Sequence, residues 1–323
     1  MSDQLKKYLA SFLKLRIDRA HGTAPHKSIL LLSVLQAYLN GSISNSRIYI
    51  TPELVALFKT NWSQLVSSNH TCQFALPFYH LTSDKFWKLI PKQGFENILQ
   101  FKSSMRSFTN LYAAIDYALI DDSLFLLMQD PTSNRVLQQF LLGEYFPYTK
   151  RVFTYSTACQ QKIYDDIKGK ILNEDPAEYR KEIRTLFKQQ NEEEIYLRGS
   201  IFKREVPKIY NYTCCISGMK IDTIYSVSMV DACHIVPFSE SYDDTITNGI
   251  SLCPNLHRAF DRGLISVDEN YKVLVNPNWN EKLSHYSIKQ FEGIQILLPT
   301  NPGQLPLPEN FQNHRKRFGF QGT

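Results

Sequence analysis

The sequence predicts an α+β protein with two domains and a helical linker between them. The chain has 323 residues, 43% of them hydrophobic, which is enough to bury two cores. Apolar residues recur at helical spacing in the first half, whereas short β-prone segments surround one short helix in the last third. A charge-rich stretch separates these regions. We therefore expect domains over 1–158 and 198–323, joined by a linker over 159–197.

The N-terminal domain is expected to combine helices with strands. Residues 28–39 are an apolar run of helical length, and Pro25 before them is a helix start signal. Residues 53–66 carry apolar residues at helical spacing. The segments FALPFYHL and SDKFWKLI, followed by a helical stretch that ends near Phe146, complete one mixed α/β unit.

The linker and the C-terminal region differ from the N-terminal domain in composition. Residues 160–196 are rich in charge and poor in aromatic side chains, which favours helices exposed to solvent. From Arg198 on, the β-prone segments are IYSVSMV, LISV and KVLV. The last basic cluster, NHRKRFGF, is expected to be a solvated tail.

Charge and hydropathy limit the classes of function. The chain has 36 basic and 31 acidic residues, a net charge of +5, which is compatible with nucleic acid but does not argue for it alone. No apolar run approaches the length of a membrane span, and the N-terminus lacks the hydrophobic segment of a signal peptide. We therefore expect a cytoplasmic protein with no membrane partner.

The six cysteines show no C-x-x-C pair. In a reducing compartment most of them are expected to be free thiols. A structural zinc site built from Cys214 or Cys215 with Cys253 is conceivable, but the lack of paired spacing argues against it.

Three polar residues stand out in the C-terminal region. They are His234, Asn248 fourteen residues later, and His257 nine residues after that. His234 follows a β-prone run and comes shortly before Pro237, so we expect it to end a strand.

His257 lies in the predicted short helix. Pro254 suits the first turn of this helix and Gly263 its exit. His257 and Asp261 are four residues apart, so they are neighbours on one helical face. An imidazole and a carboxylate placed in this way can hold one divalent cation.

A strand ending in a histidine, a loop with an asparagine, a helix with a second histidine and then two short strands follow one another in this chain. This order resembles the ββα-metal fold of HNH endonucleases. The segments CHIVPFS, TNGISLC and LHRAFDRGLI are similar to the branch found in modification-dependent bacterial restriction enzymes, and the match covers residues 205–275. The resemblance implies metal-dependent cleavage of double-stranded DNA, with His234 as the general base and Asn248 bracing the loop that presents it. His257 and Asp261 would bind the cation, Mg²⁺ or Mn²⁺.

These residue types suit the reaction. A neutral imidazole can take a proton from water near neutral pH. A cation stabilises the charge that develops on the phosphate and on the leaving 3′ oxygen. The alternative is that His234 and His257 are ordinary core or surface histidines, which the combined pattern disfavours.

The chain departs from related sites at the third metal ligand. That ligand often precedes the base histidine, and here the position is Cys233. A thiolate is a poor partner for magnesium, so water or Asp231 could take its place.

The N-terminal half carries a second resemblance. The segments APHKSILLL and ALPFYHLTSDKFWKL are similar to the sulfur-recognising domain of type IV restriction enzymes, which cleave phosphorothioate DNA. The resemblance implies that this half reads a modified DNA backbone. His26 and Lys27 lie at a helix start, which suits a phosphate.

The sulfur itself would favour a shallow apolar cup. Pro77, Phe78 and Tyr79 could form the cup, with His80 donating to a neighbouring oxygen. The family usually has an aromatic residue where this chain has Leu76, which changes the shape of the cup. Two further aromatic residues nearby are expected to be core, namely Phe86 and Trp87.

Other functions remain open at this point. The reader could recognise a modified base such as methylcytosine. The protein could also be a DNA-binding regulator with an inactive HNH scaffold or, more distantly, a structural or toxin-like adaptor. A homodimer would allow a nuclease with one site per chain to cut both strands.

Overall fold

The computed structural model is mostly helical with small sheets, which confirms the α+β class. It describes residues 2–15, 24–97, 104–153, 157–221, 227–282 and 284–320. The chain divides into two compact units: unit 1 is Met1–Asp166 with Glu192–Leu197, and unit 2 is Ile167–Asn191 with Arg198–Thr323. Within the described ranges, no helix has both the length and the apolar character that crossing a bilayer requires.

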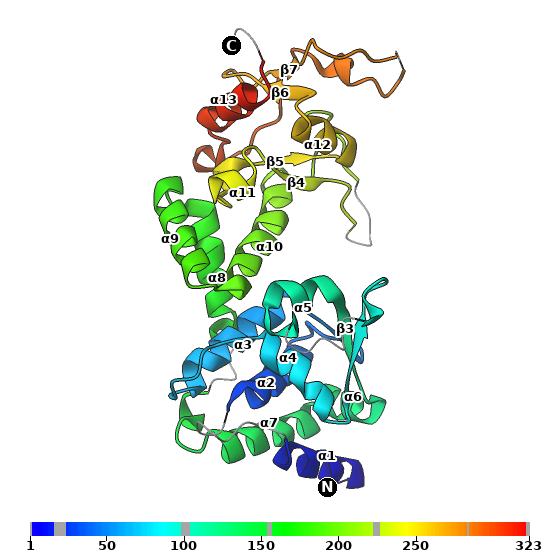
Figure 1. Cartoon of the computed structure of the whole chain (residues 1–323), viewed down its shortest axis with the longest axis vertical. Coiled ribbons are helices and arrows are strands. Elements are labelled where there is room, and N and C mark those ends of the chain that lie inside the picture. Colours follow the sequence, from blue (N-terminus) through cyan, green and yellow to red (C-terminus); the bar gives the residue numbers. More distant parts are fainter. Residues whose placement is uncertain are drawn as a thin grey trace. The chain divides into compact units, whose positions relative to one another are not determined.

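Unit 1 combines an antiparallel three-stranded sheet, ordered β1-β3-β2, with helices (Figure 1). Its elements are, in chain order, α1 (Asp3–Leu13), α2 (His26–Leu39), β1 (Arg47–Tyr49), α3 (Pro52–Leu65), α4 (Ala75–His80), β2 (Trp87–Pro91), α5 (Phe108–Ala114), β3 (Ile115–Ile120), α6 (Asp122–Gln129) and α7 (Pro131–Tyr145). The helices expected over 28–39 and 53–66 are confirmed as α2 and α3.

Helix α2 is the centre of unit 1. Every residue from Lys27 to Tyr38 is buried, because α2 packs against α3, α4, α6 and α7. A helix that is apolar on all sides is stable only when it is enclosed in this way.

Unit 2 holds two small antiparallel sheets, β4-β5 and β6-β7. Its elements are α9 (Pro176–Lys188), β4 (Asp231–His234), α11 (Phe238–Ser241), β5 (Gly249–Leu252), α12 (Pro254–Asp261), β6 (Ile265–Val267), β7 (Val273–Val275) and α13 (Pro308–Arg317). Two more helices have residues in both units, α8 (Thr157–Asn173) and α10 (Glu192–Ile209). The segment expected to be a linker is therefore helical, and its residues 167–191 belong to unit 2.

Two expectations for unit 2 need correction. The β-prone segment IYSVSMV lies partly outside the described residues, and 227–230 are not in a strand; the strand begins at Asp231, where pairing with β5 begins. The C-terminal cluster is not a solvated tail. It lies on the amphipathic helix α13, which buries Phe311, His314 and Arg315 on one face.

Candidate active site

A hairpin and the helix that follows it build the site. Strand β4 ends at His234, as expected, and pairs with β5 so that His234 lies opposite Gly249. Helix α12 then begins at Pro254, and Gly263, with a φ of 65°, follows its last turn. The local signals in the sequence therefore place both histidines as expected.

Helix α10 forms one wall of the site. A Cβ on Gly249 would lie 2.6 Å from Val206 Cγ2 and 2.9 Å from the ring of Phe202, so only glycine permits this close approach. The ring of Phe202 stacks on that of His234, with centroids 4.0 Å apart and planes inclined by 11°. The imidazole is thereby held on one face.

A buried carboxylate orients the imidazole. Asp244 Oδ1 lies 2.7 Å from His234 Nε2, and the two side chains are 2% and 22% exposed. An ionised carboxylate only accepts hydrogen bonds, so in neutral His234 the proton is on Nε2 and Nδ1 is left as the acceptor. Sequence reasoning missed Asp244. The available signal was the Asp-Asp pair in SYDDTITNG, but nothing in the sequence says which aspartate reaches the ring.

Asn248 holds the loop that carries Asp244. Its Oδ1 accepts a hydrogen bond from the Val236 amide at 3.0 Å, and its Nδ2 donates to the carbonyls of Val236 and Asp243 at 2.9 and 3.0 Å. The Asn248 side chain is fully buried. It therefore binds the backbone at both ends of the loop.

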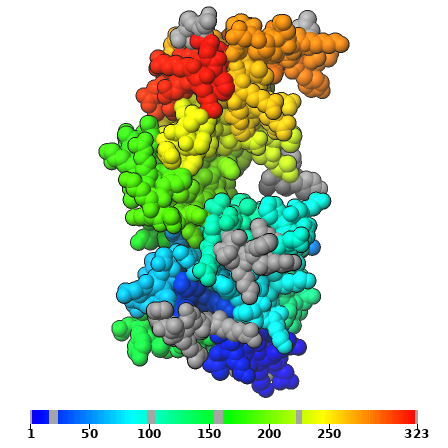
Figure 2. All heavy atoms as spheres, viewed as in Figure 1, coloured from blue at the N-terminus to red at the C-terminus, as the bar shows by residue number. Residues whose placement is uncertain are grey.

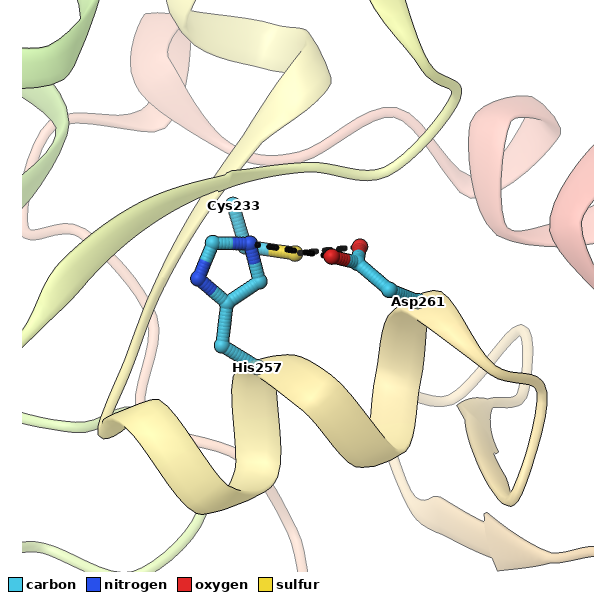
Figure 3. Close-up of side chains that lie close together, drawn as sticks. All are labelled: Cys233, His257 and Asp261. Atoms are coloured by element: carbon cyan, nitrogen blue, oxygen red, sulfur yellow. Dashed lines mark hydrogen bonds and ion pairs between the residues drawn. The ribbon is translucent and has the colours of Figure 1, made fainter. Parts of the chain in front are cut away.

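Three side chains that could ligate a metal lie close together between β4 and α12 (Figure 3). His257 Nε2 lies 3.4 Å from Asp261 Oδ2, and the thiol of Cys233 lies 3.8 Å from Asp261 Oδ1. One ligand atom from each of these three residues lies within 4.8 Å of the others. Burial raises the pKa of the Cys233 thiol, and the neighbouring charge of Asp261 raises it further.

Asp231, which was considered as the third metal ligand, lies on the other side of the His257 ring from Asp261. Its Oδ2 lies 3.6 Å from His257 Nδ1, whereas Asp261 faces Nε2. Histidines that ligate a metal through one nitrogen commonly present the other to a carboxylate. Asp231 therefore faces the ring nitrogen opposite the one that Asp261 faces, and it lies outside the group of Cys233, His257 and Asp261.

The spacing of these atoms fits a small divalent cation. Adjacent ligand atoms lie roughly 3.0 Å apart around an octahedral ion with bonds of about 2.1 Å, and roughly 3.3–3.8 Å apart around a tetrahedral ion with bonds of about 2.0–2.3 Å. His257 Nε2 lies 3.4 Å from Asp261 Oδ2, and Cys233 Sγ lies 3.8 Å from Asp261 Oδ1. His257 and Asp261 are therefore the residues that would hold the ion, with the Cys233 thiol beside them.

His234 and the candidate metal ligands face one cavity. His234, His257 and Asp261 line a space of about 260 Å³ together with Arg317 and Phe318 from the end of α13. A proton acceptor and a cation site that share a cavity can act on the same water and phosphate.

The cysteines considered for zinc do not complete a site. A hydrogen bond from Cys253 lowers the pKa of Cys214, so these two thiols are neighbours, and Cys215 is fully buried. Among the residues that the structure describes, the one group of three metal-ligating side chains within reach of each other contains Cys233.

The basic residues expected to contact phosphate in unit 1 are engaged within the protein. Lys27 Nζ lies 2.6 Å from Asp84 Oδ2, and the two side chains are 6% and 7% exposed. Lys27 is therefore an internal ion pair, which corrects its expected place on the surface. His26 is half-buried on Trp62, with Nε2 at 2.9 Å from the Thr71 carbonyl, and burial lowers its pKa.

The residues expected to form the apolar cup are also inside the unit. Pro77 and Tyr79 are buried on α4, and Phe78 is fully buried. Only His80 of this group is exposed. The cup is therefore not an open surface in this structure, because α4 packs its apolar face on α2. Phe86 and Trp87 are core, as expected.

Comparison with known proteins identifies the C-terminal region. Residues 214–268, which include the hairpin and α12, match the family model of HNH endonucleases. The C-terminal region therefore contains an HNH endonuclease domain.

Among solved structures, a distant similarity is to a modification-dependent TagI restriction endonuclease, with 19% identity and a TM-score of 0.29. The alignment covers 36% of this chain and 36% of that one, so it spans about a third of that enzyme. A comparison with curated proteins found no match.

Proposed function

We propose that the protein hydrolyses phosphodiester bonds of double-stranded DNA with His234 as the general base. The observation that carries the proposal is the single cavity lined by His234, His257 and Asp261. His257 and Asp261 hold the divalent cation, Mn²⁺ or Mg²⁺. When bound, the cation stabilises the charge that develops on the phosphate and on the leaving 3′ oxygen.

His234 acts through Nδ1. His234 Nε2 donates its proton in a hydrogen bond to Asp244 Oδ1, with 2.7 Å between the two atoms. Nδ1 can therefore take a proton from water as the water oxygen attacks phosphorus. The bond from phosphorus to the 3′ oxygen breaks, and the 3′ oxygen takes a proton from solvent, leaving a 5′ phosphate and a 3′ hydroxyl. Asp244 stabilises the imidazolium that forms, as buried carboxylates do in other acid–base pairs.

The test is nicking of a supercoiled plasmid in Mn²⁺. His234→Ala should abolish nicking and leave DNA affinity nearly unchanged, because the base acts on water and does not hold DNA. His285→Ala is the matched control, since His285 is an exposed histidine outside the cavity. A wild-type protein that binds DNA without nicking it would favour the inactive regulator instead.

We further propose that the enzyme is a modification-dependent restriction endonuclease and that unit 1 reads the modification. Phosphorothioate is the first candidate, on the strength of the two N-terminal motifs. Lys27 and Tyr79 are buried and His26 is engaged with Trp62 and the Thr71 carbonyl, so contact to DNA falls to the exposed His80. Phosphorothioate, cytosine-methylated and plain duplexes should be compared as substrates. Equal cleavage of all three rejects modification dependence, and preference for the methylated duplex selects the modified base.

A further inference from the structure

The C-terminal helix α13 is a fixed part of the nuclease unit. Phe311 is fully buried and makes an edge contact with Phe260 of α12, with centroids 6.4 Å apart. His314 stacks on the same Phe260 ring at 3.8 Å. Its ring nitrogens lie 2.9 Å from Ser266 Oγ and 3.0 Å from the Phe260 carbonyl. These contacts fix α13 against α12 and β6.

The end of α13 is held as closely as its middle. A Cβ on Gly263 would lie 2.2 Å from the ring of Phe318, so the chain after α12 leaves room for this aromatic ring. Arg317 precedes Phe318, and its guanidinium lies over that ring at 5.3 Å. The Phe318 ring therefore supports the guanidinium of Arg317 on one face.

Arg317 brings positive charge to the catalytic cavity. The cavity also contains His234, His257 and the carboxylate of Asp261. A DNA phosphate that enters it meets the negative charge of Asp261. Besides the cation, a guanidinium is the group best suited to offset that charge, because its planar donors match phosphate oxygens.

A carboxylate pairs with Arg317 in the absence of DNA. Glu240 Oε1 lies 2.8 Å from Arg317 Nη1, and the two side chains are 51% and 41% exposed. Glu240 belongs to α11, and Figure 2 shows the atoms of this region, in yellow, against those of the C-terminal helix, in red. An ion pair this exposed contributes little to stability, so a phosphate can replace the carboxylate.

We propose that Arg317 binds a backbone phosphate of the DNA at the cleavage site and that Glu240 occupies the same guanidinium until DNA arrives. This inference rests on the proposed nuclease function, since it assumes that DNA enters the cavity. It makes Arg317 a substrate-binding residue and Glu240 a competitor of the substrate.

The experiment measures binding of a short duplex to the full chain by fluorescence anisotropy, without divalent cation so that the duplex stays intact. Arg317→Ala should lower affinity about tenfold, and the slope of log affinity against log salt should become shallower by about 0.9, the value for one phosphate contact. Lys316→Ala is the matched control, because this neighbouring residue is exposed but does not line the cavity. Glu240→Gln should bind DNA at least as tightly as wild type, and Arg317→Lys should fall between Arg317→Ala and wild type.

The two variants of the pair separate the proposal from a structural role. If Glu240→Gln loses as much affinity as Arg317→Ala and both lower the melting temperature, the pair only stabilises the fold and the proposal is overturned. An unchanged salt dependence in Arg317→Ala overturns it as well. In either case, nicking by the wild type would leave the nuclease assignment intact, whereas a wild type that neither binds nor nicks DNA would reject both.

Discussion

The carboxylate of Asp244 gives a sharp test of the catalytic arrangement. It lies 2.7 Å from His234 Nε2, and its side chain is 2% exposed. In Asp244→Asn the negative charge is lost, and the new amide can donate a hydrogen bond to Nε2. The imidazole would then carry its proton on Nδ1, the nitrogen that should accept a proton from water. We therefore expect Asp244→Asn to lose activity in two ways.

The charge alone sets a lower limit on the effect. A hydrogen bond to a charged group contributes roughly 1.5–3 kcal/mol. If all of it is expressed when the imidazolium forms, the rate falls by about 10- to 150-fold. Single-turnover nicking in Mn²⁺ measures the rate, and anisotropy should show unchanged DNA affinity. Asp116→Asn, an exposed carboxylate in unit 1, is the control. A folded Asp244→Asn variant that nicks at the wild-type rate would refute the role of this carboxylate.

Three further outcomes are expected. Changing His257 or Asp261 to Ala should weaken Mn²⁺ binding in calorimetry and lower nicking activity, and excess cation should partly restore that activity. Unaltered Mn²⁺ binding in both variants would show that other groups hold the ion. Lys27→Ala leaves Asp84 buried without its cation and should cost roughly 3–5 kcal/mol of unfolding free energy; an unchanged melting temperature would contradict this. Burial lowers the pKa of His314 from 6.5 to about 4. Between these two pH values the unfolded chain binds a proton at this residue and the folded chain does not, so the free energy of unfolding decreases as the pH falls from 6.5 toward 4. The melting temperature of wild type should fall in this range more steeply than that of His314→Gln.

The parts of the fold that the sequence predicted correctly are those set by local signals. The apolar run of α2 and the Pro254 start of α12 each depend on residues within one element. The four-residue spacing of His257 and Asp261 also fixes their relation within one helix. These features can be inferred before any tertiary contact is known.

The partners of these residues could not be inferred in the same way. Lys27 and Asp84 are 57 residues apart, and both belong to short motifs that suggested a surface. Their burial as an ion pair depends on how α4 and the turn after it pack on α2. A lysine at a helix start is compatible with a phosphate contact or with an internal carboxylate, and only the packing decides between them.

Gly249 shows how the candidate site depends on α10, a helix that begins in the segment predicted to be a linker. Its backbone is extended, with φ −126° and ψ 141°, so any residue could adopt its conformation. The requirement for glycine comes from α10, since Val206 and Phe202 occupy the space of a Cβ. The same Phe202 ring stacks on His234. A glycine in the hairpin is therefore required by a helix that begins in the expected linker, and α10 packs on both Gly249 and His234 of the candidate site.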